Sequence, residues 1–138
     1  YSNEVIVENG GDIFIKTDIV RRIGIFAGTS PLSEKIAIGI QPEKTPLGVC
    51  TSSGTVGHSL SFGKADAVVI ISKDTFLADA AATSVCNRVQ SEKDFESALE
   101  YALSIDGVEG ALIILGDKIA VRGDIKLAPF NQFTNLTP

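Results

Sequence analysis

Residues 48–89 read GVCTSSGTVGHSLSFGKADAVVIISKDTFLADAAATSVCNRV, which joins a loop-like segment to an apolar run and then to a helical pattern. The run at residues 65–72 has the length of a strand and is nearly continuous, which predicts a central strand covered on both faces. Asp74 or Thr75 can cap the helix that follows, which reaches about Arg88. The sixteen residues 48–63 include four Gly and six Ser or Thr, so we expect a loop whose amides and hydroxyls can approach a ligand.

The remainder of the chain predicts a mixed α+β fold around this segment. The sequence NGGD at residues 9–12 tolerates positive φ and predicts a tight hairpin turn. A second, amphipathic helix starts at Ser91, whose hydroxyl faces Asp94 in a near capping box, and ends at residues 106–107. Short β-branched segments predict further strands at residues 4–8, 13–16, 23–27, 35–41, 111–115, 119–122 and 125–127.

Composition bounds the class of protein. The 138 residues are 44% hydrophobic and 21% charged, which predicts one globular domain over residues 1–138. A net charge of −5 provides no basic field for a nucleic acid or an anionic membrane surface, so neither partner is expected. The longest apolar runs are far shorter than the roughly 20 residues of a membrane helix. We therefore expect a cytoplasmic protein, and open strand edges make a homodimer a further expectation.

Two features concern the cysteines and the start of the chain. Cys50 and Cys86 lie among small or apolar residues without a spaced framework, which indicates reduced thiols, although a disulfide between them is an open alternative. The chain contains no Met and begins YSNEVIVENGG, with no helix cap before its first strand. We expect that an N-terminal portion of the full protein is missing.

Asp79 and Thr83 are the candidate metal ligands. They lie four residues apart, so they share one helix face, and both offer the hard oxygen atoms that Mg²⁺ accepts. In the alternative interpretation, Thr83 bonds back to the Asp79 carbonyl while Asp79 interacts with the helix dipole. Spacing alone leaves both interpretations open.

The segment before the helix holds the other candidates. Its TSSGT sequence at residues 51–55 can form an anion-binding nest or a plain turn. His58, the only histidine, is a candidate acid, base or ligand contact, or an ordinary loop histidine. Cys50 is a candidate nucleophile, but that role needs a nearby cation to lower its pKa, and a buried packing role is the alternative.

Three motifs carry a family resemblance. ENGGD at residues 8–12, TSSGT at residues 51–55 and ADAAAT at residues 78–83 resemble, in this order, the motif series of the ApbE-like superfamily, whose named members are FAD:protein FMN transferases. The longer string GVCTSSGTVGHSLSFGKADAV, followed by LADAAAT, resembles an ApbE-related branch beside the transferases. The resemblance covers essentially the whole chain and implies a T-fold-related mixed sheet with packed helices, and an FAD site closed by Mg²⁺. Members of the branch are longer at the N-terminus, in agreement with a missing portion.

The resemblance also assigns expected roles to residues. It matches Asp79 and Thr83 to the superfamily's metal-binding Asp and Thr. Residues expected near the flavin nucleotide are Gly10, Gly11, Asp12, Thr51, Ser52, Ser53, Gly54 and Thr55. The transferases carry His-Ile-Ile-Asp-Pro-x-Thr-Gly before the metal helix, whereas residues 58–63 here read HSLSFG, so only His58 corresponds. This departure favours a retained pocket with altered chemistry over flavin transfer onto a protein threonine.

Three hypotheses for function follow. The first is an enzyme-like protein that binds FAD or a similar dinucleotide with Mg²⁺. The second is a sulfur-handling protein that uses Cys50, suggested by an apparent association of the branch with anaerobic sulfur and homocysteine metabolism. The third is a non-catalytic binding or scaffold module that kept the fold and lost the site.

Overall fold

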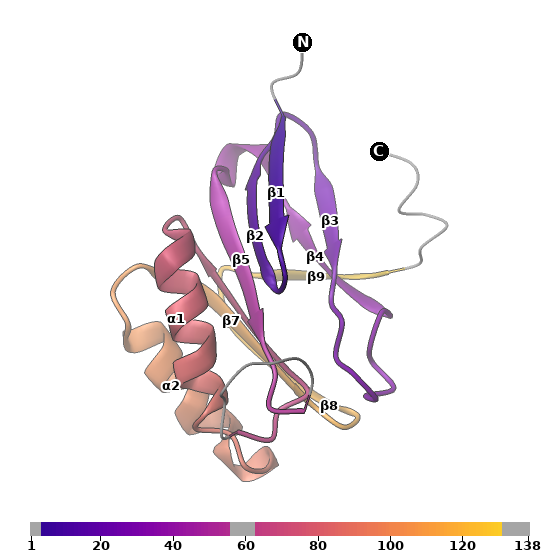
Figure 1. Cartoon of the computed structure of the whole chain (residues 1–138), viewed down its shortest axis with the longest axis vertical. Coiled ribbons are helices and arrows are strands. Elements are labelled where there is room, and N and C mark those ends of the chain that lie inside the picture. Colours follow the sequence, from indigo (N-terminus) through magenta and orange to yellow (C-terminus); the bar gives the residue numbers. More distant parts are fainter. Residues whose placement is uncertain (1–3, 56–62, 131–138) are drawn as a thin grey trace.

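The computed structural model describes residues 4–55 and 63–130, and these form three layers (Figure 1). A six-stranded sheet, in the order β1-β2-β5-β6-β7-β8, is the middle layer. Two helices cover one of its faces, and a three-stranded sheet, β3-β4-β9, covers the other. Every strand pairing in both sheets is antiparallel. The mixed α+β class predicted from the sequence is therefore confirmed.

The elements have the following bounds. The strands of the large sheet are β1 (Val5–Asn9), β2 (Asp12–Lys16), β5 (Leu47–Ser52), β6 (Ala67–Ser72), β7 (Val108–Leu115) and β8 (Lys118–Gly123). The strands of the small sheet are β3 (Arg21–Gly24), β4 (Ile36–Ile40) and β9 (Lys126–Pro129). The helices are α1 (Thr75–Cys86) and α2 (Phe95–Ser104), with short 3-10 helices η1 (Pro42–Lys44) and η2 (Glu92–Asp94).

Strand β6 lies at the centre of the fold, and all six of its residues are buried. Its side chains alternate between two apolar cores: Val68 and Ile70 face the helices, whereas Val69 and Ile71 face the small sheet. A strand with apolar neighbours on both faces needs apolar residues at every position. The predicted central strand is thus confirmed.

The helix signals of the sequence are also confirmed. The carboxylate of Asp74 accepts a hydrogen bond of 3.1 Å from the Leu77 amide and caps α1. The helix ends at Cys86, two residues before the predicted end. Ser91 and Asp94 form a complete capping box, although the first turn after Ser91 is the 3-10 helix η2.

The sequence prediction was wrong for residues 48–52, which form strand β5 rather than part of a loop. Small residues there serve close packing: a Cβ built on Gly48 would lie 2.6 Å from the Cα of Thr75 in α1. The glycine therefore lets the helix approach the sheet, although the composition of residues 48–52 resembles that of a loop. The strand predicted at residues 125–127 corresponds to β9, which begins one residue later and pairs with β4 in the small sheet. The strand predicted at residues 23–27 lies two to three residues earlier, as β3.

No helix within residues 4–55 and 63–130 combines the length and apolar character required to cross a membrane.

The core assignment makes a prediction about stability. Leu112 of β7 is fully buried between the two sheets, so we expect Leu112→Ala to lower the free energy of unfolding by about 2–5 kcal/mol. Leu127→Ala is the matched control, because Leu127 is 41% exposed and should lose a fraction of that amount. Urea denaturation measures both, and equal losses would contradict the assignment of the core.

Candidate functional site

A cleft of about 530 Å³ opens beside the turn of the β1–β2 hairpin. The hairpin turn and the end of β5 meet there with α1 and with the β3 segment. Its lining residues are Glu8, Gly10, Gly11, Asp12, Ile13, Ile23, Gly24, Phe26, Thr51, Ser52, Ser53, Asp79 and Thr83. Eight of the sequence-predicted site residues thus lie in one cleft, namely Gly10, Gly11, Asp12, Thr51, Ser52, Ser53, Asp79 and Thr83.

The hairpin turn needs glycine at both central positions. Gly10 has a φ of 62°, a left-handed conformation that favours glycine, and Asn9 pairs with Asp12 across the turn, as predicted. The carbonyl of Gly11 accepts a hydrogen bond of 2.8 Å from the Thr51 amide. A Cβ on Gly11 would lie 2.5 Å from the Thr51 carbonyl oxygen, so only glycine allows this approach to β5.

Two carboxylates face each other across the cleft. Asp12 pairs with Cys50 in the sheet register, and its carboxyl interacts with that of Asp79 on α1. Burial raises the pKa of Asp12, the Asp79 carboxyl raises it further, and a hydrogen bond from Cys50 opposes these effects. The repulsion between two anionic groups held this close is relieved either by a shared proton or by a cation.

Thr83 lines the same cleft one helical turn beyond Asp79. Over residues 4–55 and 63–130, no group of three or more His, Cys, Asp or Glu side chains is arranged to hold a metal ion. Asp12, Asp79 and Thr83 together offer two carboxylates and a hydroxyl. This set fits Mg²⁺, which is commonly held by one or two carboxylates while waters and ligand phosphates complete its coordination.

Ser52 ends β5 with a side chain that lacks a partner. It is 6% exposed, and its hydroxyl is the one buried side-chain polar atom without a hydrogen bond in the described part of the chain. An unsatisfied buried hydroxyl costs roughly 1–3 kcal/mol. Because Ser52 also lines the cleft, a bound ligand is the natural source of the missing partner.

Gly54 and Thr55 lie outside the lining of the cleft. The Thr55 hydroxyl donates to the Asp66 carboxylate at 3.1 Å, and the Gly54 amide donates to the Ala65 carbonyl at 2.9 Å. A Cβ on Gly54 would meet the backbone of Gly63, so this glycine serves close backbone packing. His58 lies outside the described residues.

The surroundings of Cys50 disfavour its thiolate form. Its side chain is fully buried, and its sulfur donates to the Thr75 carbonyl at 3.5 Å. Burial, followed by the Asp12 charge, raises its pKa to about 12, the opposite of the shift that a nucleophilic thiolate needs. Cys50 and Cys86 are not joined to each other, so the structure does not contain the disulfide left open by the sequence.

The sequence did not reveal the apolar wall of the cleft. Ile13, Ile23 and Phe26 line it, and Phe26 is 56% exposed. Ile23 and Phe26 follow β2 in the sequence but belong to the small-sheet side of the fold. Only the packing of two separate sheets brings them beside Thr51, and no local pattern encodes that contact.

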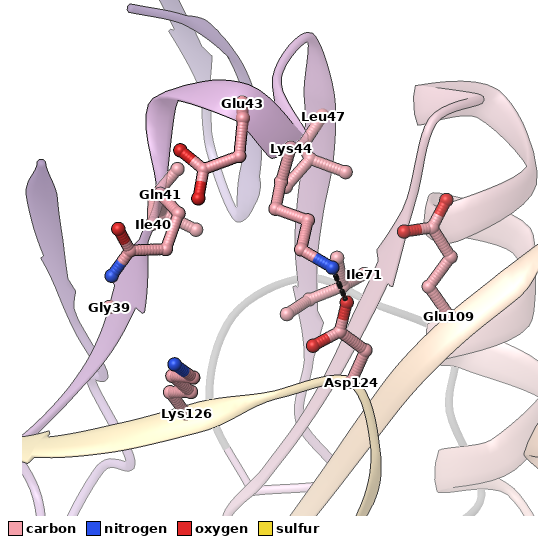
Figure 2. Close-up of a pocket in the computed structure, with 10 residues that line it drawn as sticks. All are labelled: Gly39, Ile40, Gln41, Glu43, Lys44, Leu47, Ile71, Glu109, Asp124 and Lys126. Atoms are coloured by element: carbon pink, nitrogen blue, oxygen red, sulfur yellow. Dashed lines mark hydrogen bonds and ion pairs between the residues drawn. The ribbon is translucent and has the colours of Figure 1, made fainter. Parts of the chain in front are cut away.

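A second cavity of about 290 Å³ lies near the opposite end of β5 (Figure 2). Leu47, the first residue of β5, lines it, together with Lys44 and Asp124, whose side chains form an ion pair of 2.7 Å. Glu43, Gln41 and Lys126 surround the opening. None of the sequence-predicted site residues lines this cavity.

Comparison with known proteins gives one family. A family model described as "AbpE bacteria" matches residues 1–127. UPF0280 proteins are similar over most of this chain: that of Methanosphaerula palustris is 48% identical over 120 residues, covering 87% of this chain and 49% of its own length. That of Methanocaldococcus jannaschii is 41% identical over 131 residues, covering 90% and 53% respectively. The chain therefore spans about half the length of the curated relatives it matches.

From the interaction between the Asp12 and Asp79 carboxyls, we predict how the stability of the protein depends on pH. Because the pKa of Asp12 is raised on folding, its contribution to stability is favourable at low pH and is lost as the pH rises through the folded pKa. We expect Asp12→Asn to raise the free energy of unfolding at pH 7 without ligand. The gain should shrink to nothing below the unfolded pKa of about 3.9.

Urea denaturation at pH 7 and pH 3.5 measures this difference. Asp117→Asn, at a turn residue with a 74% exposed side chain, is the matched control and should change little. A loss of stability in Asp12→Asn at pH 7 would contradict repulsion between the two carboxyls.

The buried thiols make a second prediction. We expect neither cysteine of the native protein to react with iodoacetamide at pH 7.5, whereas both should react in urea. Mass spectrometry of the labelled peptides measures the two rates. Rapid native labelling of Cys50 would revive a nucleophilic role for this residue.

Proposed function

The chain belongs to the AbpE bacteria family, and from the geometry of the candidate cleft we propose that it binds a flavin-type or other dinucleotide together with Mg²⁺. The cleft volume of about 530 Å³ is within the range of small-molecule sites. Its lining combines backbone turns, hydroxyls, the three carboxylates of Glu8, Asp12 and Asp79, and an apolar wall. Such a combination suits a ligand with both an anionic and an aromatic part.

The unpartnered hydroxyl of Ser52 is the observation that carries the proposal. Folding leaves this polar atom buried without a hydrogen bond, although alanine would fit the same place. Stability therefore does not explain the serine. A ligand oxygen in the cleft would accept a hydrogen bond from the Ser52 hydroxyl, and the neighbouring Thr51 and Ser53 would add further hydroxyl contacts.

The electrostatics of the cleft support a cation beside this hydroxyl. Asp12 and Asp79 would hold Mg²⁺ with the Thr83 hydroxyl, and the ion would neutralise phosphate groups that two carboxylates alone would repel. Without the cation, an anionic ligand would be repelled by the carboxylates that line the cleft. We therefore expect ligand binding to depend on Mg²⁺.

The apolar wall supports an aromatic group at the other side of the cleft. Ile13, Ile23 and the half-exposed Phe26 offer a surface on which a planar ring can lie. This wall is what distinguishes a dinucleotide or flavin from free pyrophosphate as the proposed ligand. Pyrophosphate would satisfy only the polar side.

The geometry gives less support to the sulfur-handling hypothesis. Cys50 is buried beneath α1 with a pKa of about 12, and burial together with the carboxylates Asp12 and Asp79 raises that pKa. A thiolate beside two carboxylates is disfavoured. The thiol of Cys50 instead donates to the Thr75 carbonyl, a contact between β5 and α1.

Calorimetric titration of the full-length protein with FAD tests the proposal. We expect binding with Mg²⁺ and none without it, abolished by Asp79→Ala and retained in the matched control Asp117→Ala. Ser52→Ala should weaken binding by about tenfold yet leave the free energy of unfolding unchanged or slightly higher, because it removes an unpaired buried hydroxyl.

Two outcomes would contradict the proposal. Binding of equal affinity with and without Mg²⁺ would remove the role of the carboxylates. No binding of FAD, ADP or pyrophosphate under any condition would leave the scaffold hypothesis, in which Asp79→Ala alters stability alone.

A further inference from the structure

Strand β1 is an open edge of the large sheet, and its first three residues are apolar. Val5, Ile6 and Val7 are 48%, 50% and 55% exposed, and all five residues of β1 are exposed. Consecutive residues of a strand point to opposite faces, so apolar side chains are uncovered on both faces of the sheet. This pattern is typical of a strand that lies inside a sheet.

The opposite edge of the same sheet is built differently. Strand β8 carries Lys118 near one end and Arg122 near the other. Basic residues of this kind protect an edge strand from pairing with another chain. Within β1 the only charged residue is Glu8, and no proline or bulge interrupts the pairing with β2.

The register of β1 with β2 shows which face of the large sheet each apolar side chain of β1 lies on. Val7 pairs with Phe14, on the face where Asp12 meets α1, whereas Ile6 pairs with Ile15, which packs against the small sheet. Helix α1 packs mainly on β5 and β6, and the small sheet β3-β4-β9 packs on the other face of the large sheet. Neither layer buries Val7 or Ile6.

We propose that in the full-length protein the part of the polypeptide outside residues 1–138 adds a strand to β1 and covers both faces of Val5, Ile6 and Val7. The matched relatives are about twice as long as the segment they share with this chain, which leaves a region of similar size to supply a strand and its covering layers. Pairing with β1 of a second copy would supply a strand alone, because that copy's β1 lacks covering layers too.

The proposed contact also bears on the candidate cleft, although it does not depend on any ligand. Glu8, in β1, and Gly10, in the hairpin turn, line the cleft. A strand paired with β1 would therefore fix the hairpin from its free side and hold one wall of the cleft in place.

Thiol labelling of the full-length protein tests this inference. Val7→Cys places a probe on β1, and Val121→Cys places a matched probe on β8, where Val121 is 40% exposed. Cys50 and Cys86 are fully buried and give little background. We expect maleimide to label Val7→Cys about tenfold or more slowly than Val121→Cys, and equal or faster labelling would overturn the inference.

Hydrogen exchange of the unmodified full-length protein gives a second readout that needs no substitution. The amides of β1 should exchange as slowly as those of β6, and exchange as fast as in an exposed turn would overturn the inference. Light scattering across a dilution series decides the occupant. Protection that persists in a monomer supports the proposal, whereas protection lost as a dimer dissociates would assign the edge to a second copy.

Discussion

The close approach of α1 to β5 is the constraint on which the fold and the candidate cleft both depend. Gly48 has no side chain where Thr75 passes over the sheet, and the buried face of α1 consists largely of Ala78, Ala81 and Ala82. These small residues set the height of the helix above the sheet. At that height Asp79 lies within interaction distance of Asp12, so the packing of the core determines the electrostatics of the cleft.

The cleft keeps features that folding alone would remove. Asp12 and Asp79 repel each other, and the hydroxyl of Ser52 is buried without a partner. Each lowers stability, and a simple substitution would relieve each. Local departures of this kind, in a fold whose other levels agree, are expected at functional sites. Together they explain why the cleft, rather than the cavity beside Lys44, is the better candidate.

Sequence patterns predicted the elements whose signals are local. The apolar run of β6, the cap at Asp74 and the glycine turn of the hairpin each depend on a few adjacent residues, and the structure contains all three. Strand β5 was not predicted because its small residues, such as Gly48 and Cys50, give it the composition of a loop. Their small size serves the packing of α1 on the sheet, which is a long-range contact. The spacing of Asp79 and Thr83 indicated a shared face, whereas their meeting with Asp12 needs the β2–β5 register. The wall at Ile23 and Phe26 depends on the packing of two sheets, which no local window contains.

In the proposed site, Asp12, Asp79 and Thr83 hold a divalent cation beside a ligand contacted by Ser52. A crystal structure of the full-length protein grown with FAD and Mn²⁺ in place of Mg²⁺ tests it most directly, because anomalous scattering locates the metal independently of the protein. We expect an anomalous peak between Asp79 and Asp12, with ligand density within hydrogen-bond distance of the Ser52 hydroxyl. A cleft that contains neither metal nor ligand, or a metal bound elsewhere on the chain, would contradict it.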